Sequence, residues 1–107
     1  MKMLLTADRR KLLSNGETSA ETGETATDCV VKYFDCMGRY TFYAFDAQAH
    51  GDSGDLSMFG YCVSPHGPDC DEWGSVLLSE LESLRRIERD MYFDGVTREE
   101  LSEGKRP

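Results

Sequence analysis

The sequence predicts a small α+β fold in which an antiparallel sheet of three to five strands is packed by two or three short helices. Two segments rich in β-branched and aromatic residues occur at hairpin spacing, and two capping-box patterns that predict helices follow later in the chain. At 107 residues the chain has the size of one ordinary domain with one modest core. We therefore expect a single domain over residues 1–107.

The N-terminal part is expected to hold one short helix and one loop. Residues 6–13 have helical character, with Asp8 near the positive end of the helix dipole and Asn15-Gly16 as the stop. The following residues are polar and lack large apolar side chains, which predicts a mobile loop over about 15–28.

The central part is expected to form the sheet. Residues 29–34 and 40–45 predict an antiparallel hairpin, and residues 56–63 and 73–77 predict two further strands. Loops are expected at 47–55, which contains two glycines, and at 64–69, where two prolines remove backbone donors. Four large side chains are expected to be mostly buried: Phe42, Phe59, Trp73 and Leu81.

The C-terminal part is expected to hold two helices that begin with capping boxes. In the first, Ser79 is the expected N-cap and Glu82 reaches back; in the second, Thr97 begins a last short helix. Between them, the charged block Glu88-Arg89-Asp90 could form an ion-pair corner or a recognition patch, and the structural role is favoured because an Arg between acids commonly pairs with them. Residues 91–93 predict an edge strand or packed extended segment, and residues 103–107 are expected to fray.

The charge balance disfavours several classes of partner. Twenty acidic residues against twelve basic ones give a net charge of −8, which repels phosphate backbones and anionic lipids. We therefore expect no direct binding to nucleic acid or membrane. The apolar run at residues 3–5 is too short for a signal peptide, so a cytoplasmic location is expected. The cysteines are then expected to be free thiols; they are Cys29, Cys36, Cys62 and Cys70.

A weak metal-ligand pattern is present in the proline-containing loop. Cys62, His66 and Cys70 follow a Cys-x3-His-x3-Cys spacing, with His50 and Asp69 as additional candidate ligands. Structural zinc sites usually contain closely spaced ligand pairs, which are missing here. We therefore expect a loop histidine between two ordinary thiols, with no metal and no other cofactor.

Acidic loop residues are the candidate binding residues. Asp52 and Asp55 lie in the glycine-containing loop, and three further acids follow the prolines: Asp69, Asp71 and Glu72. Loops on a rigid sheet commonly carry recognition, and these carboxylates have no evident capping role in the sequence. The Asp52/Asp55 and Glu80/Glu82 pairs are interpreted as solvated surface rather than as acid-base groups.

Several blocks of the sequence resemble a known family. The most specific are Leu-Ser-Glu-Leu-Glu-Ser at 78–83 and Ile-Glu-Arg-Asp-Met-Tyr-Phe at 87–93, and the similarity extends over residues 4–93. They resemble a family of small bacterial, plasmid and phage proteins catalogued as a domain of unknown function. The resemblance implies a fold and a mobile-element context but no reaction. The chain departs from the family pattern at Ala44, where a Glu is usual, and in a shorter spacer between Leu84 and Ile87.

These observations favour a non-enzymatic protein-binding accessory of a mobile genetic element, such as an acidic inhibitor of a host defence or nucleic-acid-handling protein. The expected partner is a protein that meets the acidic residues. One alternative is a small enzyme or ligand-binding domain that uses an aromatic sheet face, with Tyr33, Tyr43 and Tyr61 as wall residues. Another is a metal-stabilised module built on Cys62, His66 and Cys70.

Overall fold

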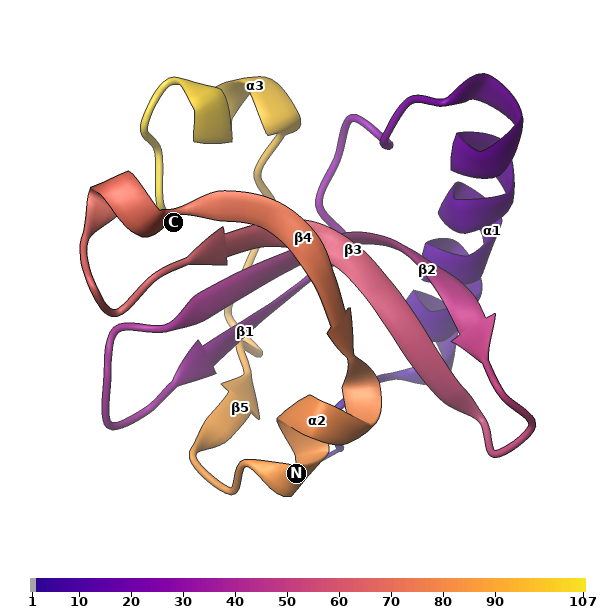
Figure 1. Cartoon of the computed structure of the whole chain (residues 1–107), viewed down its shortest axis with the longest axis horizontal. Coiled ribbons are helices and arrows are strands. Elements are labelled where there is room, and N and C mark those ends of the chain that lie inside the picture. Colours follow the sequence, from indigo (N-terminus) through magenta and orange to yellow (C-terminus); the bar gives the residue numbers. More distant parts are fainter. Residues whose placement is uncertain (1) are drawn as a thin grey trace.

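The chain forms one five-stranded antiparallel sheet with three short α-helices (Figure 1), as expected. The computed structural model describes residues 2–107. In chain order the elements are α1 (Thr6–Thr22), β1 (Val31–Asp35), β2 (Thr41–His50), β3 (Asp55–Val63), the 3-10 turn η1 (Pro68–Cys70), β4 (Glu72–Leu77), α2 (Leu78–Ser83), β5 (Ile87–Arg89) and α3 (Arg98–Ser102). The strand order is β4-β3-β2-β1-β5.

Strands β1 to β4 follow one another as a meander. The predicted hairpin is confirmed, with Tyr33 opposite Phe42, and β3 and β4 occupy the two further strand segments. β2 continues beyond the predicted end at residue 45, through a bulge that shifts its register there and places Ala47 in the same cluster as Phe42 and Ala44. The predicted loop at 47–55 is therefore reduced to the turn at 51–54.

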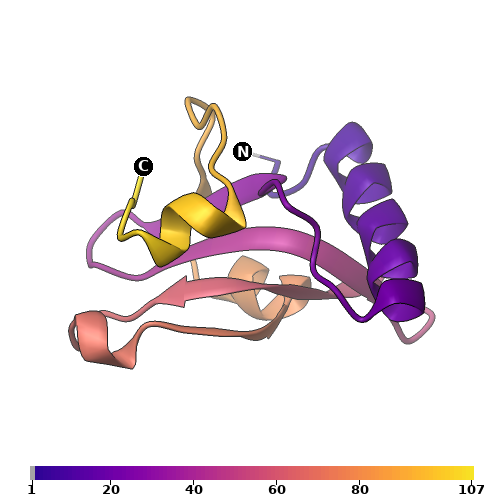
Figure 2. The same cartoon turned by 90° about the horizontal axis from the view of Figure 1, so that it is seen from above.

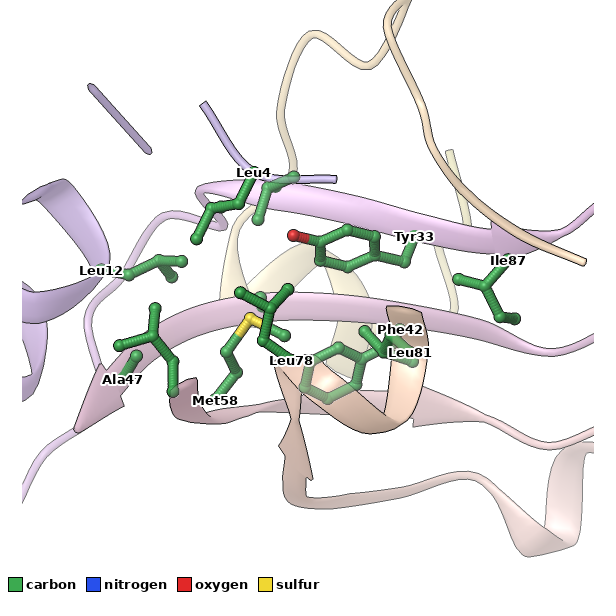
Figure 3. Packing of buried hydrophobic residues seen from close by; sticks show 12 residues of the cluster. Leu4, Leu12, Tyr33, Phe42, Ala47, Met58, Leu78, Leu81 and Ile87 are labelled. Carbon is green, nitrogen blue, oxygen red and sulfur yellow. The ribbon is translucent and has the colours of Figure 1, made fainter. Parts of the chain in front are cut away.

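The two faces of the sheet carry separate apolar clusters. On one face, Leu12 of α1 and Leu81 of α2 belong to the same cluster as Phe42 and Met58 (Figure 3). The helices α1 and α2 therefore pack on the same face of the sheet. The opposite cluster contains Tyr43, Phe45, Val96 and Leu101, so α3 covers part of the other face.

Helix α1 is longer than the sequence indicated. It passes through Gly16 and ends at Thr22, so the predicted stop is wrong and residues 15–22 are not a loop. The glycine is buried where the helix lies against β2: a Cβ at Gly16 would stand 1.9 Å from the Ala47 carbonyl oxygen. Gln48 Nε2 donates to the Gly16 carbonyl at 3.0 Å. Gly16 therefore permits a close helix-strand contact instead of ending the helix.

The start of helix α2 also differs from the expectation. Ser79 lies inside the helix, and Glu80, not Glu82, accepts the backbone N–H of Leu77 at 3.1 Å. Ser79 donates its own N–H and its hydroxyl to the carboxylate of Asp55, at 2.9 and 2.6 Å. A side chain from the start of β3 thus satisfies the first turn of α2.

The edge strand on the far side of β1 is β5, not residues 91–93. Tyr92 lies in a turn and is 89% exposed. Arg89 has the favoured structural role but not through its neighbouring acids: it donates to the Lys2 carbonyl at 3.0 Å. Asp90, which follows β5, instead forms an ion pair with Lys32 on the neighbouring strand β1, at 3.2 Å.

The C-terminal residues fold back onto the sheet. Thr97 and Glu100 exchange the two hydrogen bonds of the predicted capping box, which confirms α3. Residues 103–107 were expected to fray, but Arg106 donates to the Leu101 carbonyl and to the Tyr61 hydroxyl, at 2.8 and 3.1 Å. Within residues 2–107, none of the helices has the length and hydropathy needed to span a membrane.

Candidate binding surface

The net negative charge is confined to one part of the chain. All twelve Lys and Arg residues lie outside residues 40–84, whereas eight of the twenty acids lie within them. The remaining acids and bases balance, so residues 40–84 account for the whole charge of −8. These residues supply β2, β3, β4 and α2. We call this segment the acidic half; its acids are Asp46, Asp52, Asp55, Asp69, Asp71, Glu72, Glu80 and Glu82.

Two of the five predicted binding residues have structural roles. Asp55 binds the first turn of α2 through Ser79, and these hydrogen bonds lower the pKa of its carboxyl group. The side chain of Asp71 is only 6% exposed; it accepts the Ser64 N–H at 2.8 Å and faces Arg106 at 3.4 Å. The expectation that these carboxylates have no capping role is therefore wrong for Asp55, and Asp71 serves to hold the loop.

The exposed acids lie at two ends of the sheet. Asp52 is in the turn between β2 and β3, whereas Glu72 pairs with Cys62 near the other end of β3 and Asp69 lies in the 3-10 turn beyond it. The nine residues of β3 span roughly 26 Å, so the five predicted residues do not form a single patch. Asp69 and Glu72 instead stand at the start of β4, and Glu80 and Glu82 follow its end on α2. Partner binding by these acids stays a prediction.

An aromatic cluster surrounds Trp73 on the face that α3 partly covers. Its ring centroid lies 5.1 Å from that of Phe45, 5.8 Å from Phe59 and 5.3 Å from Tyr61. Trp73 is nevertheless 38% exposed and Phe59 is half-buried, so the predicted burial is wrong for Trp73 and only partly right for Phe59. It is confirmed for the other two residues, Phe42 and Leu81.

The predicted tyrosine wall is divided between the two faces. Tyr43 and Tyr61 lie opposite each other on the aromatic face. Tyr33 belongs to the cluster on the other face, where it is fully buried and donates its hydroxyl to the Met3 carbonyl at 2.7 Å. Burial raises the pKa of Tyr43 to about 12, so its hydroxyl stays protonated at neutral pH. Tyr33 therefore cannot belong to a site on the face that carries Trp73, Tyr43 and Tyr61.

An open groove of about 580 Å³ lies beside the aromatic cluster. Phe59 and Trp73 line it together with α3 and the segment after α1, which contribute Thr25, Thr27, Arg98, Glu99 and Ser102. The Nε of Arg98 is buried and has no hydrogen-bond partner among the described residues. The groove therefore offers an aromatic surface and a buried donor. Its residues come from four separate segments, so no local sequence pattern indicates it.

Asp46 is the one acid among the described residues that is buried as a whole residue, backbone included. It lies on β2 beside the bulge and is 5% exposed, and its Oδ2 has no hydrogen-bond partner. Burial raises the pKa of its carboxyl group, although a hydrogen bond from Ser19 of α1 acts in the opposite direction. Asp46 is thus the carboxyl group for which ionisation is least favourable.

The candidate metal ligands do not converge. Cys62 is half-buried on β3, while His66 and Cys70 are exposed in the following loop. No three His, Cys, Asp or Glu side chains within residues 2–107 are grouped so that they could hold a metal ion. Each of the four cysteines is a free thiol in the structure, and burial raises the pKa of Cys29 to about 12.

Comparison with known proteins places the chain in one family. No curated protein and no solved structure shows significant similarity to it. A family model described as "Protein of unknown function (DUF2958)" matches residues 3–103, which is nearly the whole chain. The chain therefore belongs to the DUF2958 family.

Proposed function

We propose that the protein is a non-enzymatic binding module of a mobile genetic element that attaches to a basic partner protein through its acidic half. The observation that carries the proposal is the separation of charge: residues 40–84 hold the whole charge of −8, and the rest of the chain is neutral. Exposed carboxylates at the two ends of this half attract a basic partner during approach and raise the association rate.

The charge also indicates which partners fit. Proteins that handle nucleic acid present basic surfaces to phosphate, and an acidic module that occupies such a surface inhibits them by competition. A host defence protein that acts on nucleic acid has the same surface. The carboxylates of the exposed acids Asp52, Asp69, Glu72 and Glu82 make no hydrogen bond or ion pair within the described chain, so they can meet such a partner.

A pair of charge variants tests the proposal. One carries Asp52→Asn, Asp69→Asn, Glu72→Gln and Glu82→Gln, all exposed in the acidic half. The control neutralises four exposed acids outside it: Glu17→Gln, Glu21→Gln, Asp94→Asn and Glu103→Gln. Both change the net charge equally.

Each protein is used as bait for affinity capture from host cells at low and high salt. The proposal expects a basic protein that the wild type and control retain, that the first variant loses, and that 0.5 M salt elutes. Equal capture by all three baits at low salt would contradict it.

A second candidate function rests on the aromatic groove. Trp73 and Phe59 offer a stacking surface, and the unpaired Nε of Arg98 offers a donor, so the fitting ligand is a planar ring that carries an anionic group. Trp73 is the single tryptophan of the chain, and its fluorescence reports on binding there. Titration with nucleoside monophosphates and aromatic carboxylates should give saturable quenching that Arg98→Ala weakens. If Trp73 fluorescence did not change during these titrations, the groove would not be a binding site for such ligands.

A further inference from the structure

Strand β4 forms an open edge of the sheet. It pairs with β3 on one side, and no other element lies beyond it in the described chain (Figure 2). Natural proteins usually protect such an edge with lysine, proline, a bulge or a very short strand. The six residues of β4 contain neither lysine nor proline, and their pairing with β3 has no register shift. By contrast, the opposite edge strand, β5, has only three residues.

The free backbone groups of this edge can be identified. The N–H of Leu77 is accepted by Glu80, so the backbone of Leu77 faces away from β3. Backbone groups alternate along an antiparallel strand, so those of Trp73 and Ser75 also face outward. No hydrogen bond between these outward groups and another described segment is present. An added strand would therefore find two complete donor and acceptor pairs.

The surroundings of the edge select the chemistry of that strand. Trp73 is half-exposed on one face, where it offers an apolar surface. On the other face the position of a Cβ at Gly74 has no atom within 4 Å, which leaves room for a partner's side chain. Asp69 and Glu72 lie at one end of β4, and Glu80 and Glu82 lie after the other.

We propose that β4 binds an extended basic segment of the partner, which joins the sheet as a sixth strand. Alternating side chains of that segment reach the two faces: apolar ones contact Trp73, and basic ones lie over Gly74 near Glu72. The inference rests on the proposed function, because it names the part of the basic partner that the acidic half binds and the way it binds.

A second copy of this chain is a less suitable occupant. Two antiparallel β4 strands would bring Asp69 and Glu72 of one copy towards Glu80 and Glu82 of the other. Like charges placed across such an interface oppose pairing. Self-association through β4 is thus one outcome of the test, and it would overturn the assignment of a basic partner.

The test uses an eight-residue peptide of alternating lysine and valine. Binding is followed by Trp73 fluorescence, and amide hydrogen exchange of the wild-type protein is measured with and without peptide. Strand addition should slow exchange at the amides of Trp73 and Ser75, while those of Gly74 and Val76 are already protected by β3. A peptide of alternating lysine and proline has the same charge but lacks half of the donors, and it should bind at least tenfold more weakly.

Two substitutions at one position isolate the backbone contribution. Ser75→Pro removes an outward N–H without breaking the ladder to β3, and should reduce peptide affinity about tenfold or more. Ser75→Ala keeps that N–H and should bind as the wild type does. Equal binding by Ser75→Pro and Ser75→Ala, or unchanged exchange at Trp73 and Ser75 in the saturated wild-type complex, would overturn strand addition. The exchange measurement decides the matter even if the proline variant does not fold.

The same peptide separates this inference from the proposed function. Loss of binding in the Asp69→Asn, Glu72→Gln, Glu82→Gln variant together with full binding by Ser75→Pro would overturn the edge strand while supporting the acidic half. Equal binding by all variants would overturn both. Sedimentation of the free wild type as a dimer that Ser75→Pro abolishes would overturn the basic partner strand in favour of a second copy.

Discussion

Replacing Gly16 by alanine tests how closely α1 lies against the sheet. A Cβ at this position would stand 1.9 Å from the Ala47 oxygen and 2.9 Å from its carbon, whereas real Cβ contacts essentially never fall below 3.0 Å. The helix and β2 must therefore separate by about 1.1 Å. Both contacting groups belong to backbones, so no change of rotamer relieves the overlap. Overpacking of this kind lowers the free energy of unfolding by up to about 3 kcal/mol, and the better helix propensity of alanine offsets about 1 kcal/mol of that loss.

We therefore expect Gly16→Ala to lower the free energy of unfolding by about 2 kcal/mol and the melting temperature by roughly 10 °C. Urea unfolding followed by circular dichroism and by Trp73 fluorescence measures the change. Gly74→Ala is the matched control, because a Cβ there meets nothing within 4 Å; it should change stability by less than about 0.5 kcal/mol. A Gly16→Ala variant as stable as the wild type would refute the close contact, since helix propensity alone predicts a gain.

Further predictions concern the core, the thiols and the carboxyl groups. Phe42→Ala, which empties a fully buried site, should cost about 3–5 kcal/mol in urea unfolding; a loss under 1 kcal/mol would contradict the core assignment. At pH 8 a thiol reagent should modify exposed Cys36 at least tenfold faster than Cys29, whose burial raises its pKa to about 12, as mass spectrometry of timed samples would show. Asp46→Asn should raise the melting temperature at pH 7, because burial raises the pKa of Asp46 and ionisation opposes folding above that pKa; the gain should vanish in acid. Asp55→Asn should lower the melting temperature at pH 7, because the lowered pKa of Asp55 stabilises the fold above the usual carboxyl range, and this loss should also disappear in acid. If both Asn variants shifted the melting temperature in the same direction at pH 7, the buried environment of Asp46 and the hydrogen-bonded environment of Asp55 could not both be right.

Strands β1 to β4 could be predicted because their information is local, whereas β5 pairs with a distant segment and could not. Residues 29–34 and 40–45 show β-branched and aromatic enrichment around a short connection, and the structure pairs them as expected. The end of α1 could not be predicted in the same way. Gly16 has the local properties of a helix stop, and only the approach of β2, more than thirty positions later, explains why the helix continues.

In the candidate site, too, some features can be predicted from the sequence and others depend on distant contacts. The separation of charge can be read directly from the printed sequence, since no Lys or Arg occurs between Arg39 and Arg85, but a summed net charge hides it. The role of Asp55 cannot be read there, because its partner Ser79 stands 24 residues away. Likewise, the groove beside Trp73 cannot be read there, because its other walls come from α3 and the segment after α1, which are distant in the sequence.

The return of the chain to β1 at its fifth strand has a consequence for the order of folding. Strands β1 to β4 pair with their sequence neighbours, whereas Tyr33 and Arg89 meet across 56 positions. Closing so long a loop costs more conformational entropy than closing the short turns of the meander. β5 has only three residues whose contacts can offset this cost. The meander can therefore form first and keep its pairing when β5 detaches. Local opening of the protein should begin at β5 and its flanking turns, leaving the acidic half folded.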